Sequence, residues 1–218
     1  MSFLRPLDDA LSSTSKVRVL RLLVQQDRTV SAREAARLTG MSLPPILAAI
    51  NDLATLGLIT REESGNQFLC RVNREHRLYR TALKDLFAAE SRWADMVFSA
   101  IRTALAPARR SRAVAEPGSS DVLVAWVFGS AARGKDRPGS DLDLFVITAT
   151  EAAAERAMDR LAESVAGWRT EFGTDVRPVV MGRARALSER RQGNPLLTNA
   201  IEDPRVVLGT IPAELLHG

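Results

Sequence analysis

Residues 127–146 read VFGSAARGKDRPGSDLDLFV, and they set the architecture of the second half of the chain. The run 122–128 is apolar throughout, which is the composition of a buried strand. Gly129-Ser130 ends that strand, and a loop rich in turn residues follows. A second strand is expected over 141–146, where alternation places Asp141 and Asp143 on one face and apolar side chains on the other.

Asp141 and Asp143 carry the chemistry of this stretch. Two carboxylates side by side on a strand repel each other, and a divalent cation such as Mg²⁺, which prefers oxygen ligands, relieves that repulsion. The glycine turn before them offers backbone N–H groups that suit a phosphate. Phosphoryl and nucleotidyl transfer require such a phosphate-binding turn beside a carboxylate metal site. The alternative is a surface hairpin with a solvated polar strand.

The complete pattern, an apolar strand, Gly-Ser, a loop and then Asp-apolar-Asp-apolar, resembles the signature of the DNA polymerase β-like nucleotidyltransferase superfamily, and most closely its minimal branch. The resemblance implies an α/β domain, an NTP as substrate, and Mg²⁺ or Mn²⁺ as cofactor. It also assigns roles to six residues: metal ligation to Asp141 and Asp143, triphosphate binding to Gly129 and Ser130, and support of the phosphates or the loop to Arg133 and Ser140.

The superfamily has a third carboxylate, on the strand after the helix that follows the motif. In this chain residues 173–180 read GTDVRPVV, and the family's register puts Arg177 in that carboxylate's place. Asp175 lies two residues earlier on the same face, displaced by about 6.6 Å at the rise of a strand. Asp175 is therefore the candidate third ligand and catalytic base only if a bulge or register shift moves it. Pro178 predicts an edge or irregular strand.

Residues 1–76 have the element order of a winged helix-turn-helix. After a lead-in over 1–9, in which Pro6 argues against regular structure, three helices are expected over 12–27, 31–40 and 42–57. Residues 58–72 then form the pattern of a β-hairpin. The segment 51–72 resembles the third helix and wing of many bacterial transcription regulators, which place that helix in the major groove.

This resemblance makes DNA the expected partner of the first domain, with five candidate contacts: Arg33, Ser42, Asn51, Arg61 and Arg71. Phosphate contacts usually supply most of the affinity for DNA. Residues 42–56, however, contain no Lys or Arg. Dimerisation or contact with another protein is therefore the alternative role of this domain.

The domain organisation follows from these patterns. The winged helix-turn-helix is expected at 1–76, a long connecting helix at 77–106, a polar basic linker at 107–120 and the nucleotidyltransferase domain at 121–218. The fold class is thus α+β with two domains. The apolar stripe of the connecting helix could pack against the second domain or against a second copy, which makes a homodimer possible.

The composition is that of an ordinary chain with two modest cores: 218 residues, 45% hydrophobic and 26% charged. The net charge of +4 permits a nucleic-acid or nucleotide partner. Cys70 is the single cysteine, which excludes an intrachain disulfide and fits a reducing compartment. No secretory segment or membrane-spanning run is evident, so the cytoplasm is the expected location. His76 has no Cys or His neighbours at metal spacing.

Two functions follow. In the first, an enzyme transfers NMP from an NTP to the hydroxyl of a protein side chain, an RNA end or a small molecule, as relatives of the minimal branch modify partner proteins. In the second, a DNA-binding regulator keeps the nucleotidyltransferase domain as a nucleotide sensor or a structural platform. The motif makes the first function, a Mg²⁺-dependent nucleotidyltransferase coupled to a DNA-binding winged helix, the expected one. The second function is the alternative, and Arg177 in the third-carboxylate place together with the winged helix favours it.

Overall fold

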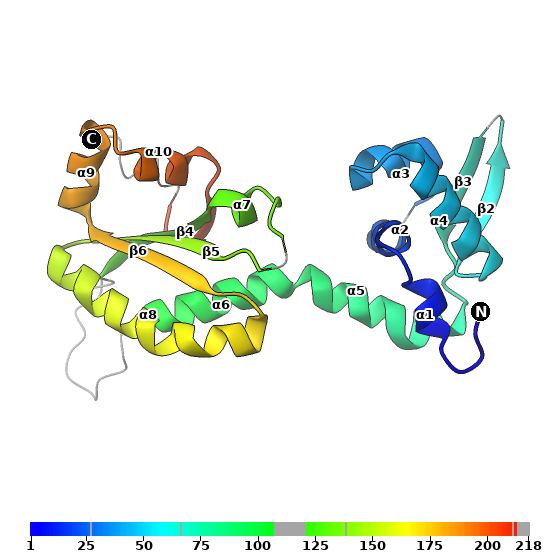
Figure 1. The fold of residues 1–218 in the computed structure, drawn as a ribbon, viewed down its shortest axis with the longest axis horizontal. Helices are drawn as coiled ribbons and strands as arrows, with labels where there is room; N and C mark the ends of the chain where they lie inside the picture. Colours follow the sequence, from blue (N-terminus) through cyan, green and yellow to red (C-terminus); the bar gives the residue numbers. More distant parts are fainter. Residues whose placement is uncertain (27, 66, 107–120, 138, 211, 213–218) are drawn as a thin grey trace. The chain divides into compact units, whose positions relative to one another are not determined.

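The computed structural model describes residues 1–26, 28–65, 67–106, 121–137, 139–210 and 212 (Figure 1). The chain divides into two compact units, Met1–Trp93 and Ala94–Gly218, and each has its own core. The linker expected over 107–120 lies outside the described residues.

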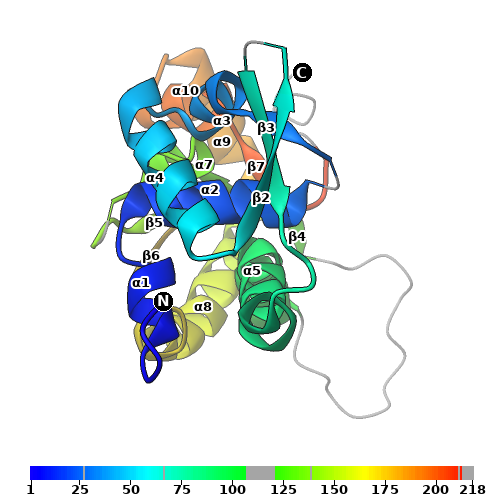
Figure 2. The same cartoon turned by 90° about the vertical axis from the view of Figure 1, so that its right-hand side faces the viewer.

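The first unit is a winged helix-turn-helix, as the sequence predicts (Figure 2). Its helices are α1 (Pro6–Ala10), α2 (Thr14–Gln25), α3 (Ala32–Thr39) and α4 (Leu43–Thr55). Its antiparallel sheet has the order β1-β3-β2, with β1 at Val30–Ser31, β2 at Ile59–Ser64 and β3 at Gln67–Val72. The hairpin β2–β3 extends away from the helices in both ribbon views (Figures 1 and 2).

Local signals explain these boundaries. Ser13 and Ser31 each accept a hydrogen bond from the backbone three residues on, which caps α2 and α3. Gly40 ends α3 with a left-handed φ of 65°. The expectation that Pro6 opposes regular structure was wrong: Pro6 lies in the first turn of α1, where the missing N–H costs no hydrogen bond.

The core of the first unit joins α2 to α4. Leu20, Leu23, Ile46 and Leu53 are at most 1% exposed. Cys70 belongs to the same core, where its thiol donates to the Val30 carbonyl oxygen at 3.0 Å. Burial raises the pKa of the Cys70 thiol to about 11, so this thiol is a packing group rather than a nucleophile.

The helical stretch that follows the wing consists of three consecutive segments. A π-helix, η1 (Tyr79–Leu83), continues into α5 (Lys84–Ser91), and α6 (Trp93–Leu105) follows after a break at Arg92. The pattern over 77–106 therefore predicted the helical conformation but not its π turn or its break. In α6, Val97, Ile101 and Leu105 are buried in the core of the second unit.

The second unit is built on a four-stranded sheet of order β6-β5-β4-β7. Strands β5 and β6 are parallel, and the other pairs are antiparallel. Strand β6 is at an edge, as Pro178 predicts. Its elements are β4 (Val122–Phe128), α7 (Gly129–Ala132), β5 (Leu142–Thr148), α8 (Glu151–Phe172), β6 (Val176–Gly182), α9 (Arg183–Arg191), α10 (Pro195–Glu202) and β7 (Arg205–Leu208).

Helices cover both faces of this sheet (Figure 1). Leu144 and Val146 of β5 pack on the α6 and α8 side, whereas Phe145 and Ile147 pack on the α9 and α10 side. On the latter side the rings of Trp126 and Phe145 stack with centroids 4.7 Å apart. Since side chains alternate along a strand, Asp143 belongs to the α9 and α10 side. Strand β5 begins at Leu142, one residue later than expected, so Asp141 directly precedes it.

Candidate functional site

The turn between β4 and α7 lies against one of the two motif carboxylates. Gly129 has a φ of 74°, in the region that residues with a side chain rarely adopt. A Cβ atom built on Gly129 would lie 2.6 Å from Oδ2 of Asp143, which is closer than real Cβ contacts. Glycine thus suits this position both for its backbone conformation and because the Asp143 carboxylate lies close to its Cα.

Arg177 lies beside both motif carboxylates. In the parallel pairing of β5 with β6, Arg177 is directly opposite Asp143. Its Nη2 atom is 2.7 Å from Oδ2 of Asp141, whose side chain is 25% exposed while that of Arg177 is 72% exposed. The cation that the family register places at the third-carboxylate position therefore forms an ion pair inside the motif.

The third candidate carboxylate faces a different partner. Asp175 forms an ion pair with Arg169 near the end of α8, the helix that covers the sheet face opposite to the one of Asp143. Its carbonyl oxygen accepts from the Leu142 N–H at 2.8 Å, so the backbone at Asp175 continues the β5–β6 pairing. Over the described residues, no three His, Cys, Asp or Glu side chains gather as metal ligands.

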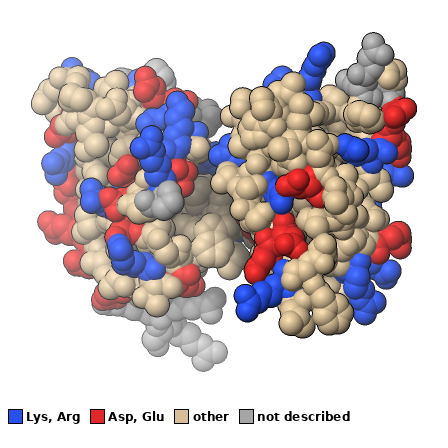
Figure 3. All heavy atoms as spheres, turned by 45° about the vertical axis from the view of Figure 1, so that its right-hand side comes forward, with Lys and Arg blue, Asp and Glu red and all other residues tan. Residues whose placement is uncertain are grey.

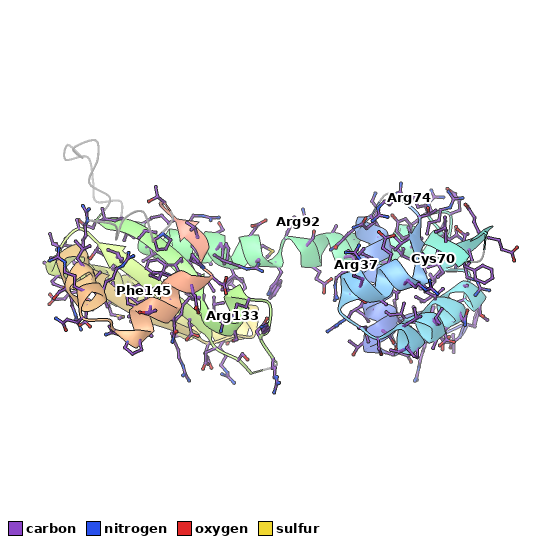
Figure 4. All side chains as sticks on the ribbon, turned by 90° about the horizontal axis from the view of Figure 1, so that it is seen from above. Arg37, Cys70, Arg74, Arg92, Arg133 and Phe145 are labelled. Carbon is purple, nitrogen blue, oxygen red and sulfur yellow. The ribbon has the colours of Figure 1, made fainter. Side chains whose placement is uncertain are left out.

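The remaining motif residues organise the loop between α7 and β5. The Ser140 hydroxyl accepts from the Arg137 N–H at 2.9 Å, and the Ser130 carbonyl oxygen accepts from the Lys135 N–H at 2.9 Å. Arg133 is the exposed residue that ends α7, and Figure 4 labels it. Ser140 thus supports the loop, while Arg133 is free to meet a ligand from solvent.

Two residues that no sequence motif identifies, Arg205 and Thr174, hold the turn and the loop of the motif in place. Arg205 of β7 donates from Nε to the Ala132 carbonyl oxygen at 2.7 Å, across 73 positions of the chain. Thr174 donates to the Ser140 carbonyl oxygen at 3.2 Å. Neither residue has a local signal, because both contacts depend on the order of strands in the sheet.

The donor set fits one divalent cation shared with a nucleotide. Mg²⁺ is commonly bound by one or two carboxylates together with substrate phosphates and water. Asp141 and Asp143 supply two carboxylates, and the carboxylate of Asp143 lies next to the candidate phosphate turn at Gly129. A second metal ion requires a further carboxylate, and Arg177 lies opposite Asp143 instead.

Burial raises the pKa of Asp143, and the charge of Asp141 raises it further, while Arg177 lowers it. Because the pKa is higher in the folded state, the folded protein binds more protons than the unfolded one between the two pKa values. The free energy of unfolding therefore falls as the pH rises through this window.

Asp143→Asn should stabilise the protein at neutral pH, seen as a rise in Tm, because it removes a partly buried charge whose desolvation raises its pKa. The gain should vanish at a pH below the ordinary carboxyl range, where the group is protonated in both states. Asp141→Asn is the matched control. It leaves Arg177 without its partner and should give no gain in thermal unfolding at either pH; equal gains for both variants would contradict this assignment.

On the first unit, two of the five candidate DNA contacts lie together. Arg61 on β2 donates to Oδ1 of Asn51 on α4 at 2.5 Å, and its guanidinium lies 5.1 Å from the centroid of the Phe68 ring. Arg71 pairs with Glu62 at 3.1 Å, which offsets its charge. Arg33 and Ser42 are exposed at the beginnings of α3 and α4, apart from this pair.

Charge is mixed over the visible surface. Figure 3 shows Lys and Arg side chains interspersed with Asp and Glu on the visible face of each unit. A large field of one sign, which would attract any nucleic acid, is not seen on this face.

Residues 116–176 match the family described as polymerase beta, nucleotidyltransferase. No curated protein matches the sequence. The chain thus contains a polymerase β-type nucleotidyltransferase segment after a winged helix-turn-helix.

Parts of the chain are similar to solved structures, including the three that follow. One is the homodimeric winged helix-turn-helix DNA-binding domain of a possible ArsR-family transcriptional regulator from Mycobacterium bovis (23% identity, 44% of this chain and 82% of that chain, TM-score 0.33). Another is a toxin–antitoxin with AMP-PNP (14% identity, 56% and 76%, TM-score 0.32). A third is a mutant of the MntA-HpeT toxin–antitoxin (12% identity, 56% and 77%, TM-score 0.32).

Within the described part of the chain, no helix is both long and apolar enough to cross a membrane.

Proposed function

We propose that this protein is a DNA-binding regulator whose nucleotidyltransferase-fold unit binds an NTP with Mg²⁺ but does not transfer its nucleotidyl group. One observation carries the proposal. Arg177, a cation, is opposite Asp143 and paired with Asp141, in the place where a catalytic site needs a third carboxylate. Without that carboxylate, nothing in the motif activates an acceptor hydroxyl.

Binding itself needs only the groups that the motif retains. Backbone N–H groups at Gly129 and Ser130 would hold the phosphates, and the exposed Arg133 would add a positive charge. Asp141 and Asp143 would hold the Mg²⁺ ion, which when bound links the carboxylates to the phosphates and offsets their repulsion. Arg177 has to leave Asp141, at least in part, for the ion to bind there.

The DNA side of the proposal rests on Asn51 and Arg61. An Asn on the third helix can read adenine with two hydrogen bonds, and an Arg can read guanine or hold a phosphate. Their present hydrogen bond pre-positions both side chains at the junction of α4 and the wing. A homodimer would double these contacts on a symmetric site.

Transfer of NMP to a protein or RNA hydroxyl is the second candidate function. It is favoured by the close approach of Asp143 to Gly129, which keeps a carboxylate at the triphosphate turn. In this case Asp175 would have to leave Arg169 and turn toward the motif. The two functions differ in one readout, the appearance of a covalently labelled acceptor.

The deciding experiment incubates the full chain with α-labelled NTPs and Mg²⁺ or Mn²⁺ in an extract of the source cells. We expect saturable nucleotide binding without any labelled acceptor, and an Asp141→Asn/Asp143→Asn protein that loses the binding. Label that appears with the unmodified protein and not with the double variant would establish the enzyme instead. Absence of both binding and label would refute each function.

For DNA, Arg61→Gln should weaken binding to a selected duplex about tenfold, the cost of one good base or phosphate contact. The duplex would come from selection on a random-sequence library at physiological ionic strength. Arg77→Gln, which removes the same charge from outside the wing, should leave the affinity within about twofold. Equal losses in a gel-shift titration would show that only net charge matters.

A further inference from the structure

The first unit contains a cavity that the proposed function does not use. Its volume is about 590 Å³, within the range of roughly 300–1,000 Å³ that small-molecule sites occupy. Every lining residue belongs to the unit Met1–Trp93, from the end of α2, the segment after the wing, and the stretch η1–α5. The lining consists of Val24, Gln25, Arg74, Tyr79, Arg80, Lys84, Phe87, Ala88 and Ser91.

One part of this lining is aromatic. Phe87 is 2% exposed and Tyr79 is 7% exposed, so both rings are fixed by the core beneath them. Tyr79 is the single tyrosine of the chain. In the described residues no hydrogen bond to its hydroxyl is found, and this oxygen is not among the buried atoms without a partner. An accessible, unpaired phenol on a fixed ring is a ready donor for a ligand.

The other part is positively charged. Arg74 (labelled in Figure 4), Arg80 and Lys84 line the cavity, and none of the described lining residues is Asp or Glu. Arg80 has one acidic neighbour, Glu75, at 3.9 Å, and both side chains are exposed, so this ion pair contributes little. Gln25 and Ser91 add neutral polar groups. Arg80 and Lys84 therefore give this part of the cavity a positive charge, which favours an anion.

The backbone at the cavity is unusual. Tyr79–Leu83 forms the π-helix η1, and two of the lining side chains, Tyr79 and Arg80, come from it. Single π turns are rare and occur preferentially at functional sites, because they shift side chains relative to a regular helix. A regular helix through 79–83 would present these two side chains at different angles.

We propose that this cavity binds a small organic anion with an aromatic body, such as an aryl carboxylate or aryl sulfonate. The rings of Tyr79 and Phe87 would contact the apolar body, and Arg80 and Lys84 would meet the charged group. The site has a route to α4: α2, whose last residues line the cavity, packs through Leu20 and Leu23 against the core that holds α4. The ligand would thus join α2 to α5 in the unit that we expect to bind DNA.

The test uses 8-anilino-1-naphthalenesulfonate, an aromatic anion whose fluorescence rises in apolar surroundings, with the full chain. We expect saturable binding that Arg80→Gln/Lys84→Gln weakens about tenfold and Tyr79→Phe weakens about threefold. The matched control is Arg77→Gln/Arg92→Gln, which removes two charges from the same helical stretch outside the lining and should leave the affinity unchanged.

A neutral analogue, N-phenyl-1-naphthylamine, separates the charged group from the aromatic body. It should bind more weakly than the sulfonate to the unmodified protein and equally well to Arg80→Gln/Lys84→Gln. Equal affinity of the sulfonate for this variant and for its matched control would overturn the proposal. Circular dichroism of each variant verifies folding, and a folded Arg80→Gln/Lys84→Gln protein that binds the sulfonate normally would also overturn it.

Discussion

Arg177→Gln is expected to raise the affinity of the Asp141–Asp143 pair for Mg²⁺ about fivefold in the presence of a non-hydrolysable NTP. Arg177 is a monovalent cation at 2.7 Å from Oδ2 of Asp141, so it competes with the metal for the same oxygen. A pair of unit charges at 4 Å interacts by about 4 kcal/mol near a protein surface. Because 72% of the Arg177 side chain is exposed, screening reduces the competition to about 1 kcal/mol, which is roughly fivefold in affinity.

Isothermal titration with Mg²⁺, and with Mn²⁺ for comparison, measures this effect. Arg169→Gln is the matched control, since it removes an equally exposed arginine that pairs with Asp175 rather than with the motif. Its effect on Mg²⁺ should stay within about twofold, because distant exposed charges are screened. An equal gain in both variants would mean that net charge, and not the Arg177–Asp141 pair, controls metal binding.

The sequence predicted the elements of this protein well because most of them are encoded locally. Ser31 and Gly40 bracket α3 through a side-chain cap and a left-handed backbone, and both signals can be read without tertiary contacts. The strand composition of 122–128 and the alternation from Asp141 onward likewise predicted β4 and β5. The expectation that Pro6 opposes regular structure was wrong because proline disrupts the interior of a helix but is favoured in its first turn.

The candidate site was predictable only in part. The spacing of Asp141 and Asp143 gives their shared face. The register of the superfamily that the motif resembles puts Arg177 in the third-carboxylate place, and the pairing of β5 with β6 has Arg177 opposite Asp143. The ion pairs could not be predicted from the sequence. The side chain of Asp175 could turn toward the motif or toward α8, and it turns toward α8 because Arg169 on that helix lies within ion-pair distance in the folded protein.

Contacts across the sheet are harder still to predict from the sequence. Arg205 reaches the Ala132 carbonyl oxygen only because β7 pairs with β4, and no local pattern fixes that strand order. The cavity beside α2 has the same origin. Its aromatic and cationic residues are at unremarkable helical spacings, and the π turn at 79–83 has no signal that propensity or periodicity could detect.

Gly129→Ala should both destabilise the second unit and abolish its binding of nucleotide. An alanine would have to hold a φ of 74°, which costs about 1–2 kcal/mol, and its Cβ would meet Oδ2 of Asp143 at 2.6 Å. This carboxylate oxygen is the end of a flexible side chain, so moving it away adds only about 0.5–1.5 kcal/mol. We expect a total of about 2–3 kcal/mol, a fall in Tm of roughly 5–10 °C, and loss of nucleotide binding.

Tryptophan fluorescence is a suitable readout for thermal unfolding, because Trp126 and Trp168 are buried in the second unit. Gly134→Ala is the matched control: its φ of 63° imposes similar backbone strain, but nothing lies within 4 Å of the added Cβ. This variant should lose only about 1–2 kcal/mol. The difference between the two alanines then measures the contact with Asp143 alone.

A double-mutant cycle isolates that contact further. With Asp143→Ala in the background, the carboxylate is absent, and Gly129→Ala should cost no more than Gly134→Ala does. The coupling energy reports how tightly the carboxylate is held against the turn. If Gly129→Ala costs the same with and without the Asp143 carboxylate, backbone strain alone explains the glycine, and the two halves of the motif do not form one site. If the cost falls, the turn and the carboxylate constrain each other, which is what a nucleotide bound across both of them requires.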